Sequence, residues 1–317
     1  MTTALGRIAT CTAAAALLCG CSPDRIVSSA TSLNASSDPE RREILIGTTT
    51  RAFLLHLPTK LPGSSAAIPL VIMLHGSGGD AADLRVVTGM SAAADDAGFI
   101  VAYAEGSHGD FSVYPSDWNA GTCCGAASRE HVDDLGFIRQ IVETVSAEFP
   151  IDQRRVYVAG FSDGGRMAYH AACQLAPMIA AIAVVSGSLV DDECTPTSPV
   201  AVLAVHGTND DEVPFNEPSE TAPPAAVPAP ALDLPASVQF WVAANGCGAS
   251  TAATDQLSTH VLEDTFSGCK GADVVAYVID GGVHGWPGQP DADVGSPMAE
   301  LNTTAVITRF FAAHPRS

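Results

Sequence analysis

The chain has 317 residues, of which 47% are hydrophobic, and this is enough to bury one large core. Acidic residues outnumber basic residues by 35 to 15, which gives a formal net charge of −20. Such a surface repels phosphate backbones and anionic membranes, so we expect no nucleic-acid partner and a neutral substrate.

The first residues have the character of an export signal. Arg7 precedes an apolar, alanine-rich run at 8–18, which is too short to span a membrane and is followed by small residues. The end of this run resembles the bacterial lipoprotein signal, in which the last cysteine, here Cys21, becomes the lipidated N-terminus. Ordinary secretory cleavage nearby is the alternative. In both cases we expect a signal at 1–20 and a mature protein that is secreted or anchored in the bacterial cell envelope.

The cysteines fit an exported chain. Two of the nine lie in the expected signal and Cys21 would carry the lipid, so six remain. An even number of cysteines outside the cytoplasm predicts disulfides, although sequence alone cannot choose the pairing. We expect Cys247 to pair with Cys269. The pairing of the other four stays open, with buried free thiols as the alternative: Cys123, Cys124, Cys173 and Cys194.

Residues 21–40 are rich in small and polar residues without apolar periodicity, so we expect a flexible tether there. Apolar, strand-like runs then alternate with helical patterns along 41–317, which we expect to form one domain. Strands are predicted at 42–46, 51–57, 69–74, 99–103, 156–159, 178–185, 200–205 and 274–279. Helices are predicted at 81–97, 132–149, 166–175, 237–244 and 302–313, while 105–129 and 215–235 are predicted to be irregular.

The strand at 69–74 is a continuous apolar run, which is typical of a strand covered on both faces. Strands of this kind that alternate with helices predict an α/β fold, a mostly parallel sheet with helices on both sides. In such sheets the functional residues gather at the carboxyl ends of the strands. We find no internal repeat and expect no transmembrane helix in the mature chain.

The stretch at 156–166 reads as a strand, a tight turn and a helix, with Ser162 at the turn. The Gly-x-Ser-x-Gly spacing has a steric reason, because side chains at Gly160 and Gly164 would collide with so sharp a turn. The N-terminus of the following helix directs N–H groups toward the same place, which favours a developing oxyanion. Ser162 is therefore the candidate nucleophile. The alternative is an ordinary N-capping serine in a glycine-rich turn.

An activated serine needs a base within hydrogen-bond reach and an acid that orients the base. In α/β-hydrolases these residues follow the serine in the order acid, then histidine, each on a loop after a strand. His284 follows the last predicted strand on a glycine-rich loop and is the best base among nine histidines. The candidate acids are Asp210, Asp211 and Glu212, and their positions alone do not separate them.

A tetrahedral oxyanion needs two hydrogen-bond donors. One should be the backbone N–H of Asp163, immediately after the nucleophile. The other should come from the glycine-rich loop at 75–79, where Ser77 is the first choice and Gly76 the second. His75 itself is expected to have a structural role.

Two tryptophans are candidate substrate-binding residues, Trp118 and Trp286. An indole near the nucleophile could stack on a phenolic acyl group or pack against a polyester methyl group, and simple packing in the core is the alternative. Asp133 and Asp134 are expected to cap or tie down the helix at 132–149. We find no metal-ligand spacing and expect no cofactor.

Seven motifs occur in order along the chain: Leu-His-Gly (74–76), Asp-Trp-Asn-Ala-Gly with Cys-Cys-Gly (117–125), Val-Asp-Asp-Leu-Gly-Phe-Ile (132–138), Gly-Phe-Ser-Asp-Gly-Gly (160–165), His-Gly-Thr-Asn-Asp (206–210), Asn-Gly-Cys (245–247) and His-Gly-Trp-Pro-Gly (284–288). Together they resemble the polyhydroxybutyrate depolymerase and feruloyl esterase family of secreted α/β-hydrolases, from about residue 51 to 288. The resemblance implies the α/β-hydrolase fold and carboxylic ester hydrolysis, with Ser162 as nucleophile, Asp210 as acid and His284 as base. It also separates Asp210 from its acidic neighbours. One departure is Gly-Val-His-Gly at 282–285, where the family tends to have Gly-Gly-His-Thr.

The resulting hypothesis is a monomeric serine esterase that acts by two-step acyl transfer and meets a membrane only through a lipid anchor. Its substrates would be polyhydroxybutyrate-type polyester or oligomers, or feruloyl or acetyl esters of polysaccharide. Two alternatives stay open. A serine peptidase uses the same triad on the same fold, and a catalytically silent lipoprotein could use the cleft to bind carbohydrate or polymer.

Overall fold

A computed structural model of the protein describes residues 39–60, 66–108, 116–216, 234–248, 252–290 and 292–316. The predicted signal, the lipidation site Cys21 and most of the irregular segment at 215–235 lie outside these ranges. So does the expected tether at 21–40, apart from its last two residues, and Glu40 already begins the first strand.

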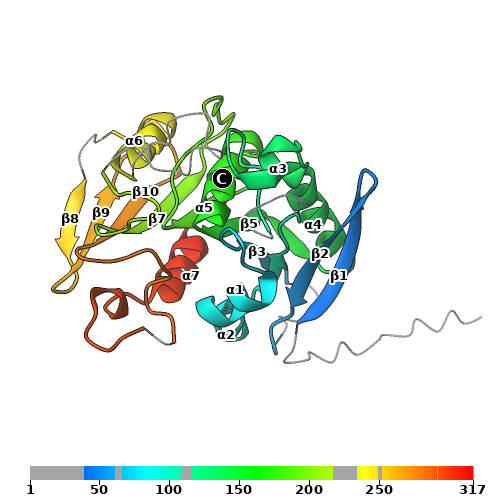
Figure 1. The fold of residues 1–317 in the computed structure, drawn as a ribbon, viewed down its shortest axis with the longest axis horizontal. Coiled ribbons are helices and arrows are strands. Elements are labelled where there is room, and N and C mark those ends of the chain that lie inside the picture. Colours follow the sequence, from blue (N-terminus) through cyan, green and yellow to red (C-terminus); the bar gives the residue numbers. More distant parts are fainter. Residues whose placement is uncertain are drawn as a thin grey trace, which may run out of the picture. The chain divides into compact units, whose positions relative to one another are not determined.

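Ten strands of the described residues form one sheet, in the order β1-β2-β4-β3-β5-β6-β7-β10-β9-β8 (Figure 1). The six strands from β4 to β10 in this order are parallel, and an antiparallel pair flanks them on each side. The prediction of a mostly parallel sheet is therefore confirmed. The strands are β1 (Glu40–Ile46), β2 (Thr49–His56), β3 (Ile68–Leu74), β4 (Ile100–Ala104), β5 (Ile151–Phe161), β6 (Ala181–Val185), β7 (Ala201–Gly207), β8 (Ala253–Gln256), β9 (Val261–Phe266) and β10 (Val274–Ile279).

Strands β3, β4 and β6 are apolar throughout because each buries both of its faces, whereas β5 is apolar only in its second half. In β3, Leu70, Ile72 and Leu74 belong to one core, whereas Val71 and Met73 belong to the core on the opposite face. Successive side chains of a strand point to opposite faces, so a strand between two cores needs an unbroken apolar run. This is the pattern on which the prediction of the strand at 69–74 depended.

Helices cover both faces of the sheet (Figure 1). One core contains residues of α4, α5 and α6, and the other contains residues of α1, α2 and α7. Strand β5 ends at Phe161 and helix α5 begins at Asp163, so the N-terminus of α5 lies at the site described below. The helices are α1 (Ala81–Thr88), α2 (Met90–Ala97), α3 (Gly125–Arg129), α4 (Asp134–Glu148), α5 (Asp163–Gln174), α6 (Leu234–Ala244) and α7 (Thr303–Ala313), with a 3-10 turn at Pro297–Ala299.

Three parts of the fold differ from the prediction. The single helix expected at 81–97 is two helices, because Gly89 between them has a φ of 60° and its N–H closes the first helix on Arg85. The short helix α3 lies in the segment that was expected to be irregular. Strands β8 and β9 were not predicted. All four residues of β8 are exposed, so no apolar alternation marks this strand in the sequence.

Three disulfides occur in the described residues. Cys247 is joined to Cys269, the pair that the sequence analysis expected. The four cysteines whose pairing was open form the bonds Cys173–Cys194 and Cys123–Cys124, the second between neighbours in the chain. Within the ranges that the structure describes, none of the helices has the length and apolar character needed to cross a membrane.

Candidate active site

Ser162 occupies the turn between β5 and α5 with φ 54° and ψ −119°, a backbone conformation that residues other than glycine seldom adopt. The neighbouring glycines allow the turn. A Cβ atom on Gly164 would lie 2.5 Å from the carbonyl oxygen of His75 and closer still to that of Leu74. A Cβ atom on Gly160 would overlap the backbone of the first helical turn. The Gly-x-Ser-x-Gly spacing therefore has the steric origin that the sequence predicted.

The three candidate triad residues each follow a parallel strand. Ser162 follows β5, Asp210 lies three residues after the end of β7, and His284 lies five residues after the end of β10. Parallel strands have their carboxyl ends at one edge of the sheet, so these residues lie at the same edge. The ring of His284 lies 5.0 Å, centroid to centroid, from the ring of Phe161, the residue before Ser162.

His284 and Asp210 form the contact expected of a base and its orienting acid. The Nδ1 atom of His284 lies 2.8 Å from Oδ2 and 3.0 Å from Oδ1 of Asp210. The carboxylate is buried, and its Oδ1 accepts the backbone N–H groups of Glu212 and Val213 at 3.0 and 2.8 Å. An N–H at Nδ1 that donates to a carboxylate leaves Nε2 free to accept a proton.

A second histidine, which the sequence analysis did not single out, supports the same carboxylate. His206 Nε2 lies 3.2 Å from Asp210 Oδ2 and 2.7 Å from the carbonyl oxygen of Val213. Burial raises the pKa of Asp210, but hydrogen bonds from His206 and His284 outweigh it and hold this pKa well below its ordinary range. Asp210 is therefore an anion at neutral pH.

The two acidic neighbours of Asp210 lie differently. Asp211 and Glu212 are both exposed, so neither has the buried position of Asp210. The side chain of Glu212 is 71% exposed, and its Oε2 lies 3.7 Å from Nε2 of His284. Glu212 therefore lies next to the nitrogen that would exchange protons, whereas Asp210 holds the opposite nitrogen.

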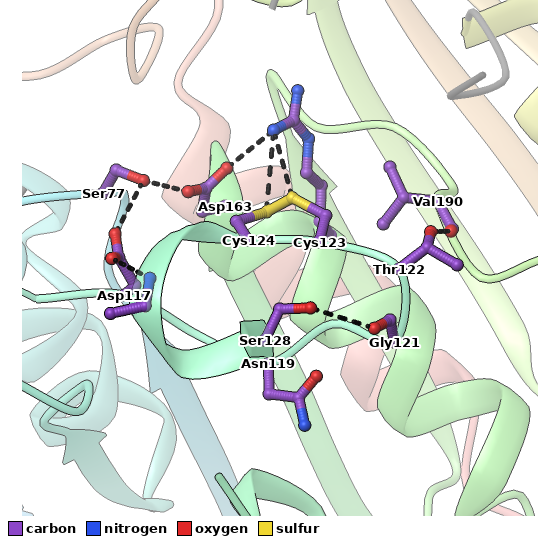
Figure 2. The surroundings of a disulfide bond; sticks show 12 residues. Ser77, Asp117, Asn119, Gly121, Thr122, Cys123, Cys124, Ser128, Asp163 and Val190 are labelled. Atoms are coloured by element: carbon purple, nitrogen blue, oxygen red, sulfur yellow. Dashed lines mark hydrogen bonds and ion pairs between the residues drawn. A yellow bond between two sulfur atoms is a disulfide. The ribbon is translucent and has the colours of Figure 1, made fainter. Parts of the chain in front are cut away.

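The two candidate oxyanion donors belong to the start of α5 and to the loop that follows β3. At the start of α5, the N–H groups of Gly165 and Arg166 bond to the Ser162 carbonyl oxygen at 2.9 and 3.1 Å, which leaves the N–H of Asp163 outside the helical bonding pattern. A Cβ atom on Gly76 would lie 3.1 Å from Cβ of Ser162, so the loop that follows β3 touches the candidate nucleophile. Ser77, in this loop, donates its hydroxyl to the carboxylate of Asp163 (Figure 2).

Arg166 is a site residue that the sequence analysis missed. Its Nη1 lies 2.8 Å from Oδ1 of Asp163, and both side chains are buried. The helix was predicted to begin at Arg166, so the pair was not considered. The i,i+3 spacing of an aspartate and an arginine on one helix is a signal that could have found it.

The structure contradicts the predicted substrate-binding role of Trp118 and Trp286. Trp118 is 0% exposed and donates its Nε1–H to the carbonyl oxygen of His75 at 2.8 Å. Trp286 is 2% exposed and donates to Oγ1 of Thr304 at 3.2 Å. A buried indole whose N–H is already bonded offers no surface to a substrate, so both rings pack in the core.

The structural roles expected for three polar residues are confirmed. His75 is buried, with its Nδ1 bonded to the carbonyl oxygen of Gly76 and its Nε2 accepting the N–H of Gly106. Asp133 caps α4 by accepting the N–H of Gly136 at 2.7 Å. Asp134 pairs with the buried Arg51 at 2.8 Å.

Comparisons with known proteins show the family of the chain. Residues 52–264 match the family model described as esterase PHB depolymerase. The "Putative esterase NocK" of Nocardia uniformis subsp. tsuyamanensis is 31% identical over 295 residues, which cover 87% of this chain and 83% of that protein. Feruloyl esterase B of Piromyces equi is 30% identical over 240 residues, which cover 74% of this chain but only 42% of that protein.

Among solved structures, an acetyl xylan esterase from Aspergillus awamori superimposes with a TM-score of 0.57 at 13% identity. The superposition covers 86% of this chain and 99% of that one, and it supports the α/β-hydrolase fold. Because the family match spans more than half of the chain, and a relative above 30% identity covers most of it, the chain belongs to the esterase PHB depolymerase family and is a carboxylic ester hydrolase.

Proposed function

We propose that the chain hydrolyses esters through a triad of Ser162, His284 and Asp210. The observation that carries this proposal is the contact between His284 Nδ1 and the buried carboxylate of Asp210, at 2.8 Å, beside a serine on a strained strand-to-helix turn. A base oriented by a buried anion and a nucleophile lifted above the sheet are the two requirements of a serine hydrolase.

The reaction would proceed in two steps. His284 Nε2 takes the proton of Ser162 Oγ as this oxygen attacks the ester carbonyl carbon, and the N–H groups of Asp163 and Ser77 stabilise the resulting oxyanion. The bond to the leaving oxygen then breaks, and His284 returns the proton to that oxygen. Water attacks the acyl-serine with the same assistance, which releases the acid and restores the serine hydroxyl.

The substrate class is a further part of the proposal. The names of the family and of the Piromyces relative support polyhydroxybutyrate-type polyester and feruloyl esters of polysaccharide, and acetyl esters of polysaccharide are the third candidate. A panel of hydroxybutyrate oligomers, methyl ferulate and acetylated xylan, compared by kcat/KM, separates the three.

We also infer that the protein acts outside the cytoplasm, as a secreted enzyme or one anchored through Cys21. Three disulfides in the described residues support this location, because such bonds persist in oxidising compartments.

Covalent labelling tests the proposed nucleophile. A fluorophosphonate should release fluoride, label the wild-type protein at Ser162 and abolish its hydrolysis of p-nitrophenyl acetate. The Ser162→Ala variant should take up no label and hydrolyse no ester. Ser107→Ala is a matched control, because this partly buried serine bonds to the carbonyl oxygen of Asp117 and should label as the wild type does. Full labelling or turnover in Ser162→Ala would refute the proposal, and a protein without turnover would favour a silent binding role.

The position of Glu212 predicts a preference among leaving groups. Nε2 of His284 returns the proton to the departing alcohol, so the Glu212 carboxylate lies on the leaving-group side. Two unit charges about 5 Å apart in water interact by about 0.8 kcal/mol, or about fourfold in rate. We therefore expect the methyl ester of 3-acetoxybutanoate to react several-fold faster, by kcat/KM, than the free 3-acetoxybutanoate anion.

In Glu212→Gln the ratio of kcat/KM for the methyl ester to kcat/KM for the free anion should fall by about fourfold. Asp211→Asn should change this ratio less. Raising the salt concentration to about 1 M should shrink it in the wild type, because the carboxylate is exposed and screened. A ratio that is the same in wild type and Glu212→Gln would show that this carboxylate does not act on the leaving group.

A further inference from the structure

Asp163 brings a buried negative charge to the place where a second negative charge must form. Its backbone N–H is a proposed oxyanion donor, yet its side chain is a carboxylate in a residue only 5% exposed. In a poorly solvated site, two anions at short range repel strongly. An unpaired carboxylate here would therefore oppose the transition state that the neighbouring N–H is meant to stabilise.

Arg166 removes this conflict. It is 8% exposed, and its Nη1 lies 2.8 Å from Asp163 Oδ1, so the two side chains form a neutral pair. The same Nη1 lies 3.6 and 3.7 Å from the sulfur atoms of Cys123 and Cys124, whose disulfide is itself buried (Figure 2). The guanidinium is thus held between the carboxylate on its own helix and a covalently closed turn from another part of the chain.

The other carboxylate oxygen of Asp163 holds the second loop of the site. Ser77 donates its hydroxyl to Oδ2 of Asp163, and Asp117 Oδ1 lies farther from the same hydroxyl, at 3.5 Å (Figure 2). A hydroxyl carries one proton, so the closer carboxylate receives it. The loop that follows β3 is therefore joined to the first turn of α5 by a hydrogen bond to a charged acceptor, the stronger kind of hydrogen bond.

We propose that the Ser77 hydroxyl, the Asp163 carboxylate and Arg166 form an oxyanion clasp, a unit that sets the distance between the two N–H donors and cancels the charge beside them. The inference rests on the proposed function, because it explains how the proposed donors of Ser77 and Asp163 are held. Within it the side chains of Ser77 and Arg166 are positioning groups: the Ser77 hydroxyl acts on the backbone donors through its hydrogen bond to Asp163, and Arg166 acts through the Asp163 carboxylate that it pairs with. A donor displaced by a fraction of an ångström stabilises the transition state less, because this stabilisation depends on a narrow range of distances between donor and oxyanion.

The Ser77→Ala variant tests the clasp, because alanine keeps the backbone N–H and removes only the hydroxyl. Loss of a whole oxyanion donor costs about 10²- to 10³-fold in kcat, so a displaced donor should cost about 10- to 100-fold. KM for p-nitrophenyl acetate should stay within about threefold, because the ester substrate carries no oxyanion. The Ki of an alkyl trifluoromethyl ketone should rise by the same factor as kcat falls, because its adduct with the serine is an oxyanion.

Two variants serve as controls for this test. Ser77→Thr keeps a hydroxyl and should restore kcat to within about threefold of the wild type. Ser128→Ala removes another hydroxyl near the same disulfide, one bonded to the carbonyl oxygen of Gly121, and should leave kcat and Ki unchanged (Figure 2). The concentration of active sites is titrated with the fluorophosphonate, and kcat is calculated from that concentration. A partly folded preparation then does not lower the measured kcat.

Each outcome bears on the clasp separately from the triad. Wild-type kcat and Ki in Ser77→Ala would overturn the clasp, and so would a rise in KM with unchanged kcat, since that would place the effect in substrate binding. Turnover that survives in Ser162→Ala would instead remove the proposed function. The Ser77→Ala variant retains Ser162, the residue that the fluorophosphonate labels, so its result is independent of the test of the nucleophile.

Discussion

Replacing Asp210 by asparagine should lower kcat for p-nitrophenyl acetate about 10⁴-fold, whereas Asp211→Asn should leave it within about threefold. An asparagine amide can donate to Nδ1 of His284, and it then fixes the tautomer with the proton on Nε2. This tautomer cannot accept the proton of Ser162. Asp211 is exposed, and the His284 ring is held through the buried carboxylate of Asp210.

The substitution should leave the fold intact. The remaining oxygen of the amide can still accept the N–H groups of Glu212 and Val213, which bond to Oδ1 in the wild type. The measurement is kcat and KM at neutral pH, with the melting temperature of each variant recorded alongside. Equal losses in Asp210→Asn and Asp211→Asn would show that the acid has been assigned to the wrong residue.

The same substitution should change the dependence of stability on pH. The pKa of Asp210 is lowered in the folded state, so its contribution is present above the unfolded-state pKa of about 3.9 and is lost as pH falls through the lower folded-state value. The stability difference between wild type and Asp210→Asn should therefore shrink in acid. Chemical denaturation at pH values from neutral to about 2 measures this difference.

Replacing Gly164 by alanine should destabilise the fold by more than about 3 kcal/mol, because the added Cβ atom meets two backbone carbonyl groups at the end of β3. A flexible side chain could move aside, but Leu74 ends a strand that is paired on both sides. The turn at Ser162 and the loop after β3 would have to separate. The expected result is a protein that does not fold, or one with a strongly lowered midpoint in urea.

Gly98→Ala is the control for this prediction. Gly98 has φ 75°, which alanine tolerates poorly, but nothing lies within 4 Å of the position of an added Cβ. The cost should be limited to the left-handed backbone, about 1 to 2 kcal/mol. If Gly164→Ala costs no more than Gly98→Ala, the close contact between the turn and the end of β3 does not limit the fold.

The features predicted correctly from sequence are those whose physical cause lies among adjacent residues. The strand at 69–74 is apolar throughout because it separates two cores, and that requirement is visible in six consecutive residues. The glycines around Ser162 are required by the turn itself, so the spacing alone predicts the turn. The placement of Asp210 and His284 after buried strands predicted that they meet at one edge of the sheet, and their contact is present.

The features that were missed depend on contacts between distant segments. Trp118 is buried because its N–H finds a carbonyl oxygen 43 positions earlier in the chain, which no local pattern shows. Gly89 breaks a helix whose apolar spacing continues across it, so periodicity alone joins the two halves. The support that His206 gives to Asp210, and the link between Arg166 and the Cys123–Cys124 disulfide, likewise exist only in the folded chain.

The two outermost strands of the sheet, β1 and β8, are its open edges. Such strands carry unpaired backbone groups that can template strand addition from a neighbouring molecule, and charge or shortness discourages this. One margin begins Glu-Arg-Arg-Glu in β1, and the other is the four-residue β8, exposed along its whole length. A sheet with so apolar an interior is therefore bordered by strands whose charge and shortness oppose strand addition from a second copy.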